Sequence, residues 1–222
     1  MTLAQAKCCL RFVKGWGMCV LMRLEIKDVI ASIALAVITL AAPSAALAGN
    51  TMETGDFTSQ PIGHYEFCKA NPDECSVQVV LTEPVVLNEN AWNVINRINS
   101  YVNDIIKPVN DYDIYGRDEM WTYPVNAGDC EDYVLLKRRF LIEKGVSPSN
   151  ALITVVRKPD GEGHAVLTIK TDKGDYILDN LTDRVRNWNR TGYTFLKRQA
   201  DTLPGRWVTI TGSKNILVSE LR

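Results

Sequence analysis

Cys130 is the first candidate for a chemically active residue in this sequence, and it lies in the segment 128–145. From Tyr133 onward apolar residues recur at helical spacing, and Gly145 is a typical helix end. The pattern predicts a helix whose first turn contains Cys130. Unpaired backbone N–H groups and the helix dipole favour a thiolate there, and the thiolate is the nucleophilic form of cysteine.

A free cysteine is also common in protein cores, where it packs as a small apolar side chain. The neighbours of Cys130 favour the reactive interpretation, because a purely apolar site would not suit Asp129, Glu131 and Asp132. A cysteine nucleophile still needs a base.

Three β-rich runs follow the predicted helix, at residues 151–158, 163–171 and 174–181. Turn residues separate them, so they predict an antiparallel meander. Such a meander places side chains of neighbouring strands opposite one another.

The candidate base is His164, at the start of the second β-rich run. The chain has two histidines, and His64 lies in a segment that we expect to be loose. Asp179 lies on the neighbouring run, where a carboxylate could fix the tautomer of the His164 ring. A single histidine on a strand is usually an ordinary polar residue, so the prediction depends on Cys130, His164 and Asp179 acting together.

Two further segments precede Cys130. Residues 89–107 carry an apolar stripe from Trp92 onward and predict an amphipathic helix whose stripe is part of the core. Residues 110–126 are rich in Asp, Tyr and Gly and predict a loop. Trp121 and Tyr123 in this loop could seal an edge of the core or line a substrate cleft.

The first 48 residues resemble a secretory signal peptide. Basic residues precede an apolar run that ends in Ala46-Leu47-Ala48. A membrane anchor is the alternative, but Pro43 shortens the run below the roughly 20 residues that a span needs. We predict export with cleavage after Ala48, a flexible mature N-terminus at residues 49–60 and a single domain at residues 61–222. Met18 and Met22 are alternative starts.

Export also determines what we expect of the cysteines. Cys68, Cys75 and Cys130 remain after the leader is removed, in an oxidising compartment. Cys68 and Cys75 flank a segment with the turn residues 71–73, so we expect them to form a disulfide. Cys130 is then the unpaired thiol. The chain carries 25 basic and 26 acidic residues, and this balance gives no sign of nucleic-acid binding.

The motifs GDCEDY, GHAVLTI and YILDN resemble those of the bacterial transglutaminase-like cysteine proteinases, over residue 61 to the C-terminus. The resemblance implies an α+β, papain-like or transglutaminase-like fold with N-terminal helices packed on an antiparallel sheet. It also implies a Cys-His-Asp triad in this chain order. Cys130 would be the nucleophile, His164 the general base and acid, and Asp179 the orienting carboxylate.

The resemblance carries expectations about biology as well. Well-understood family members are periplasmic proteases that cleave a large surface adhesin and so control biofilm attachment. They bind calcium through acidic residues that match Asp129 and Glu131 here. A receptor in the inner membrane that responds to a cyclic dinucleotide sequesters them. This chain would accordingly be a periplasmic peptidase with calcium as a structural cofactor, a protein substrate and no membrane span after leader cleavage.

The expected reaction is attack of Cys130 on an amide carbonyl, followed by hydrolysis of a thioester. The Cys130 backbone N–H would donate to the oxyanion, with Trp121 or another upstream group as the second donor. Two alternatives stay open. With an amine acceptor the same residues would make a transglutaminase or amidase, and without turnover the chain would be a periplasmic binding module.

Overall fold

A computed structural model describes residues 50–211, all of which lie within the unit Ser44–Arg222. The predicted signal peptide, residues 1–48, lies outside the described residues. No helix within the described part of the chain is both long and apolar enough to cross a membrane.

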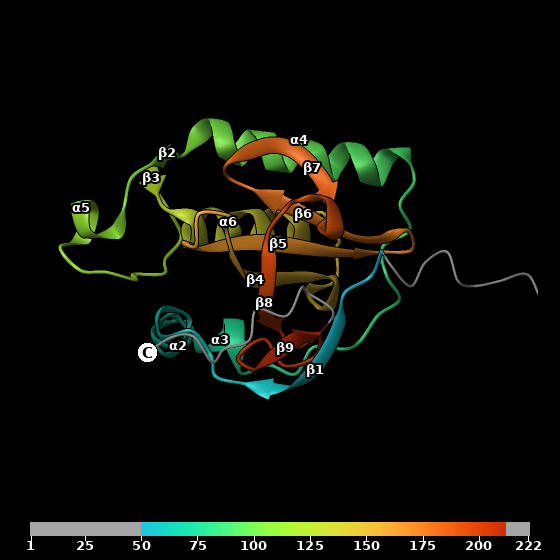
Figure 1. Ribbon diagram of the computed structural model, residues 1–222, viewed down its shortest axis with the longest axis horizontal. Helices are drawn as coiled ribbons and strands as arrows, with labels where there is room; N and C mark the ends of the chain where they lie inside the picture. The colour runs from blue at the N-terminus through green and yellow to red at the C-terminus, as the bar shows by residue number, and fades with distance from the viewer. Residues whose placement is uncertain (1–49, 212–222) are drawn as a thin grey trace, which may run out of the picture. The chain divides into compact units, whose positions relative to one another are not determined.

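One seven-stranded sheet organises the described residues (Figure 1). Every pair of neighbouring strands in it is antiparallel. Its strands in spatial order are β1 (Glu53–Thr58), β9 (Trp207–Thr211), β8 (Thr194–Gln199), β4 (Ala151–Arg157), β5 (Gly163–Thr171), β6 (Gly174–Asp179) and β7 (Thr182–Asn187). Strands β4, β5 and β6 are the meander that the sequence predicts.

The helices precede most of the sheet in the chain. They are α2 (Ile62–Ala70), α3 (Pro72–Cys75), α4 (Glu89–Ile105), α5 (Asp111–Tyr115) and α6 (Cys130–Glu143), with the short 3-10 helices η2 (Pro148–Asn150) and η3 (Trp188–Arg190). Two-residue strands β2 (Lys107–Pro108) and β3 (Ala127–Gly128) pair in parallel. Helices on an antiparallel sheet confirm the predicted α+β class.

Helices α4 and α6 pack against each other and against the β4 to β7 part of the sheet (Figure 1). The sequence of α4 explains its position, because the buried residues Ile95, Ile98, Asn99 and Val102 all lie on one face. The Asn88 side chain accepts a hydrogen bond from the Ala91 N–H at 2.8 Å and so caps the helix start. The prediction for residues 89–107 is confirmed.

The segment predicted to be a flexible tail, residues 49–60, contains a strand instead. Residues 53–58 form strand β1, which pairs with β9 and makes one edge of the sheet. The backbone hydrogen bonds of this pairing come from the far end of the chain. The composition of residues 53–58 alone could not predict this pairing, because these residues are mostly polar and nearly all of them are exposed.

The predicted loop at residues 110–126 contains one short helix, α5. Gly116 ends this helix in the left-handed conformation, with φ 67°, which glycine adopts at little cost. The pairing of β2 with β3 joins the two ends of this loop, because the Val109 N–H bonds to the Gly128 carbonyl at 3.0 Å.

Cys68 and Cys75 form the expected disulfide, with their Cα atoms 5.5 Å apart. The segment they close packs against the loop before β9, where the Gly205 N–H donates to the Cys75 carbonyl at 3.1 Å. The bridge therefore joins α2 to α3, and the backbone hydrogen bond connects α3 to the loop before β9.

Replacing Cys68 and Cys75 together by serine should lower the free energy of unfolding by about 2 kcal/mol, because only a short loop is released. Urea unfolding of the double variant and the wild type measures this change. The reactivity of Cys130 should stay the same, since that thiol is not part of the bridge. An unchanged urea midpoint, or a loss of Cys130 reactivity in the folded variant, would contradict this assignment.

Candidate active site

Cys130 is the first residue of α6, and Asp129 before it has extended backbone angles. The thiol is free and half-buried. The Ala165 N–H of strand β5 points at Sγ with a separation of 3.4 Å. This contact places the start of α6 beside the start of β5, where His164 lies.

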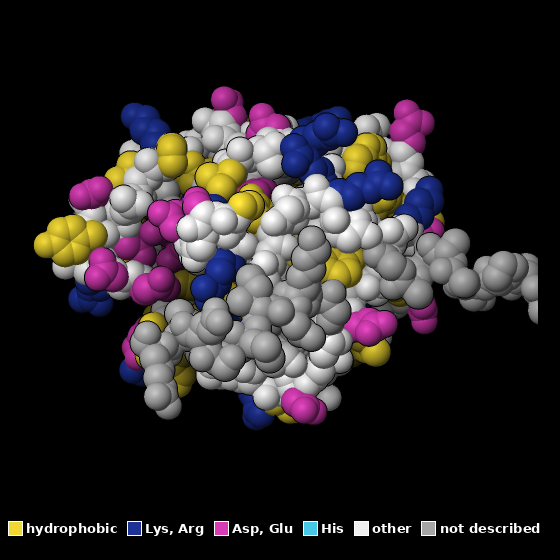
Figure 2. All heavy atoms as spheres, viewed as in Figure 1, with side chains coloured by type: hydrophobic (Ala, Val, Ile, Leu, Met, Phe, Trp, Pro, Cys, Tyr) yellow, Lys and Arg dark blue, Asp and Glu magenta, His cyan; other side chains and the backbone are white. Residues whose placement is uncertain are grey.

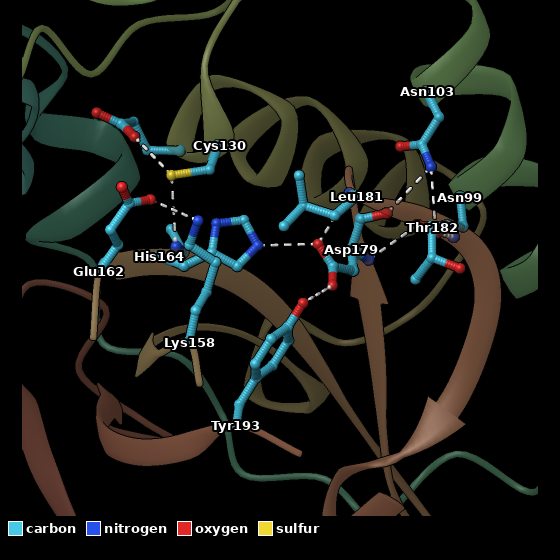
Figure 3. Close-up of polar contacts among 12 residues, drawn as sticks. Asn99, Asn103, Cys130, Lys158, Glu162, His164, Asp179, Leu181, Thr182 and Tyr193 are labelled. Atoms are coloured by element: carbon cyan, nitrogen blue, oxygen red, sulfur yellow. Dashed lines mark hydrogen bonds and ion pairs between the residues drawn. The ribbon is translucent and has the colours of Figure 1, made fainter. Parts of the chain in front are cut away.

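The imidazole of His164 lies between Cys130 and Asp179 (Figure 3). Its Nε2 is 2.9 Å from Asp179 Oδ1, so Nε2–H donates to this carboxylate. His164 and Asp179 are both buried. The other ring nitrogen, Nδ1, faces the Cys130 side of the ring (Figure 3) and keeps its lone pair when Nε2 carries the proton.

Asp179 is held from four directions. Its Oδ2 accepts a hydrogen bond from the Tyr193 hydroxyl at 2.6 Å, and Oδ1 also accepts one from the Leu181 N–H at 3.0 Å. Two side chains of α4 hold its backbone: Asn99 Oδ1 accepts from the Asp179 N–H at 3.1 Å, and Asn103 donates to its carbonyl at 3.0 Å (Figure 3). The carboxylate is therefore fixed in position before any substrate binds.

These contacts also set the charge of Asp179. Burial acts to raise the pKa of its carboxyl, but the hydrogen bonds from His164, Tyr193 and Leu181 outweigh burial and hold this pKa below its usual value.

Lys137 on α6 is fully buried nearby, and its Nζ has no hydrogen-bond partner among the described residues. Burial lowers the Lys137 pKa to about 7, against the attraction of the carboxylates of Asp179 and Asp183.

The thiol of Cys130 differs from the expectation based on the helix dipole. Burial, followed by the negative charge of Glu131, raises the pKa of this thiol well above its usual value. The thiol donates a hydrogen bond to Glu131 Oε2 at 3.2 Å, which favours the protonated form. In the absence of a bound cation, these two effects therefore oppose the thiolate that the helix dipole favours.

Three carboxylates gather beside the nucleophile. Ligand atoms of Asp111, Asp129 and Glu131 all lie within 4.8 Å of one another. Buried oxygens of Asp111, Asp129 and Asp132 have no hydrogen-bond partner within residues 50–211. Figure 2 shows acidic side chains collected on the face where α5 and the start of α6 lie in Figure 1. Hard oxygen donors at this density fit a divalent cation that prefers oxygen ligands.

The pKa values of these buried, closely spaced carboxyl groups are raised. Burial raises the pKa of Glu131 to about 9 with help from the charge of Asp129, and burial raises the pKa of Asp132 to about 8. The pKa of Asp111 rises to about 6, again mainly through burial. Such shifts mean that burial, and to a smaller degree the neighbouring carboxylates, disfavours the charged forms of these groups in the absence of a balancing cation.

The sequence model of the bacterial transglutaminase-like cysteine proteinases matches residues 54–215. The chain belongs to this family. It is therefore a cysteine peptidase, with proteins as its class of substrate. No curated protein matches this chain.

Solved structures of LapG from Legionella pneumophila are similar to this proteinase. The calcium-bound form is 24% identical with a TM-score of 0.46, and the match covers 57% of this chain and 75% of that chain. A second LapG structure is 25% identical with a TM-score of 0.45, covering 53% and 68%. An EGTA-treated form is 26% identical with a TM-score of 0.43, covering 48% and 62%.

The fold of this proteinase gives Trp121 and His64 positions that the sequence does not indicate. Trp121 Nε1 donates to Glu119 at 3.2 Å, and its ring packs edge-on to the His64 ring, with centroids 5.3 Å apart. The indole N–H is thus already engaged, and we assign Trp121 no part in stabilising an oxyanion. His64, expected in a loose segment, is a buried residue of α2, and burial lowers its pKa to about 3.

Four residues that contribute to the site were not singled out from the sequence: Asp111, Asn99, Asn103 and Tyr193. Asn99 alone carries a readable signal, because it is a polar residue on the apolar face of a predicted helix. The sulfur atoms of Cys68 and Cys75 also lie near His64. They are bonded to each other, so this second group is not a site for a metal ion.

Proposed function

We propose that this proteinase is an exported endopeptidase in which Cys130, His164 and Asp179 act as a catalytic triad. The observation that carries the proposal is their alignment: an imidazole lies between a thiol at a helix start and a carboxylate 2.9 Å from Nε2. With Nε2–H held by Asp179, His164 Nδ1 has a free lone pair on the side of the thiol. General-base activation of a cysteine requires such a lone pair on the thiol side of the imidazole.

The reaction begins when His164 Nδ1 takes the thiol proton and Cys130 Sγ attacks the carbonyl carbon of a peptide bond. Asp179 stabilises the imidazolium that forms. The Cys130 backbone N–H, in the first turn of α6 and without an intrahelical partner, donates to the oxyanion. The imidazolium then protonates the leaving amine. Water, activated by the same nitrogen, hydrolyses the thioester and releases the carboxylic acid.

We further propose that calcium is a structural cofactor held by Asp111, Asp129 and Glu131. Their oxygens are close enough to share one ion, and two of them have buried oxygens without a hydrogen-bond partner among the described residues. Calcium prefers oxygen over sulfur, so these carboxylates are its ligands and the thiol is not. Bound calcium would supply positive charge that offsets the effect of these carboxylates on Cys130.

Export through a signal peptide cleaved after Ala48 places the enzyme in the periplasm. The Cys68–Cys75 disulfide supports this location, because such bridges persist in oxidising compartments. A large surface adhesin as substrate and an inner-membrane receptor as regulator are proposed from the family resemblance alone.

The test compares native host cells that carry the wild-type chain with cells that carry Cys130→Ala. We expect at least one surface protein to be shortened only by the wild type. Mass spectrometry of the new C-terminus should find a free carboxylic acid, whereas an amide there would indicate acyl transfer to an amine. Identical surface proteins in both cells, with Cys130 of the calcium-loaded enzyme alkylated by iodoacetamide no faster than free cysteine, would refute the proposal.

A further inference from the structure

We propose that Tyr193 is a positioning residue for the His164 imidazole and acts through its hydrogen bond to Asp179. This inference rests on the proposed triad. It assigns a role in the reaction to a residue that lies outside the three motifs.

The two oxygens of Asp179 are held by different groups. Oδ1 accepts hydrogen bonds from His164 Nε2 at 2.9 Å and from the Leu181 N–H at 3.0 Å. Oδ2 accepts one from the Tyr193 hydroxyl at 2.6 Å (Figure 3). Within residues 50–211, Tyr193 gives Oδ2 its one hydrogen bond, so this hydroxyl and the two donors to Oδ1 together restrict rotation of the carboxylate about its last side-chain bond.

Tyr193 also contacts His164 directly. The two rings pack edge to face, with centroids 5.7 Å apart and an interplanar angle of 68°. The aromatic ring therefore limits where the imidazole can lie, and the hydroxyl orients the carboxylate behind it. These two contributions can be separated, because phenylalanine keeps the ring and removes only the hydroxyl.

The backbone around Tyr193 is fixed in a tight turn before β8. Gly192 has a φ of 82°, a left-handed conformation that favours glycine. The Tyr193 N–H donates to the Thr191 hydroxyl oxygen at 3.3 Å, and this hydroxyl donates to the Trp188 carbonyl at 2.9 Å. A side chain on such a turn can hold a partner in one orientation.

Removing the hydroxyl leaves the buried Oδ2 without a partner, and a buried unpaired oxygen is unfavourable. The carboxylate is then held through Oδ1 alone among the described residues and rotates more freely, because the terminal torsion of an aspartate is broad. Rotation weakens the bond to His164 Nε2, so fewer molecules hold the proton on Nε2 and the lone pair on Nδ1. The thiol consequently loses its base in a fraction of the molecules.

The experiment uses the enzyme as it is exported, with Tyr193→Phe as the test variant. We expect alkylation of Cys130 by iodoacetamide, followed at the Cys130 peptide by mass spectrometry, to slow by roughly tenfold. Nitrogen NMR of labelled histidine should show a protected Nε2–H proton on His164 in the wild type that exchanges rapidly in the variant. Since the chain has two histidines, the His164→Ala variant assigns this signal.

Tyr176→Phe is the matched control. Tyr176 is a half-buried tyrosine of the same sheet whose ring packs on Trp92, with centroids 5.3 Å apart. Its replacement should leave the alkylation rate and the His164 signal unchanged. A residue that merely fills the core would change thermal stability without changing the Nε2–H signal of the folded enzyme.

The outcomes separate this inference from the proposed triad. Wild-type rates and an unchanged His164 signal in folded Tyr193→Phe, together with a slow Asp179→Asn variant, would overturn the role of Tyr193 and leave the triad intact. If the wild type and Asp179→Asn react equally slowly and neither has a protected Nε2–H proton, both the triad and this inference are wrong. The wild-type NMR measurement decides this second case even if the Phe variant does not fold.

Discussion

Cys130→Ala should abolish peptide-bond cleavage, and His164→Ala should lower kcat/KM by at least about 10⁴-fold. The first change removes the nucleophile, and the second removes the base that generates the thiolate. Asp179→Asn should leave residual activity, because the base is present but its tautomer and orientation are no longer fixed. Once the substrate is identified, steady-state rates of the folded variants measure all three effects.

The second histidine of the chain provides a matched control. His64 is buried between Trp121 and Trp207, and the Trp207 Nε1–H donates to its Nδ1 at 3.1 Å. His64→Gln should therefore lower thermal stability while the folded fraction keeps its kcat/KM. Full activity in His164→Ala, or complete loss of activity in folded His64→Gln, would mean that the two histidines have been given the wrong roles.

The main elements of this fold can be predicted because their signals are local. The apolar stripe of α4 and the β-rich runs of the meander are readable in short windows of sequence. Cys130 at the start of α6 and the positions of His164 and Asp179 on neighbouring strands follow from these elements. Their chemistry is visible because few residue types can act as nucleophile, base and orienting carboxylate.

The remaining features depend on contacts between distant parts of the chain. Asp111 lies close to Asp129 just beyond the point where β2 and β3 pair in parallel over two residues, a bridge too short to leave a pattern in the sequence. Tyr193 reaches Asp179 from a turn before β8, on the far side of η3. The polar strand β1 is defined by its partner β9. Each of these contacts joins segments that a short window of sequence does not contain together.

The thiol pKa illustrates a different limit. Helix position was correctly predicted for Cys130, yet the helix dipole does not determine its ionisation. The larger influences are burial and Glu131, and the strength of both depends on how closely the surrounding side chains pack. A sequence identifies charged neighbours but not the distances at which they act.

The carboxylates of Asp111, Asp129 and Glu131 lead to a prediction about calcium binding, which compares Asp111 with Asp113 on α5. Calcium at about 100 times its dissociation constant should raise the melting temperature of the wild type by roughly 5–10 °C, since binding then contributes about 2.7 kcal/mol. Magnesium should have a smaller effect, because it demands a more regular geometry. EGTA should remove the calcium effect and slow the alkylation of Cys130.

Asp111→Asn should change the melting temperature in opposite directions without and with calcium. Without calcium the variant should melt at a higher temperature than the wild type, because one of the mutually repelling carboxylates is neutral while its oxygen can still accept the Met120 N–H. With calcium the order should reverse, since a ligand is lost.

Asp113→Asn is the matched control: Asp113 is exposed on the same helix and lies outside the cluster. Its replacement should leave both melting temperatures and the calcium response unchanged. If calcium raises the melting temperatures of Asp111→Asn and Asp113→Asn equally, the cluster is not the calcium site. Its carboxylates would then destabilise the start of α6 without a bound cation to offset them.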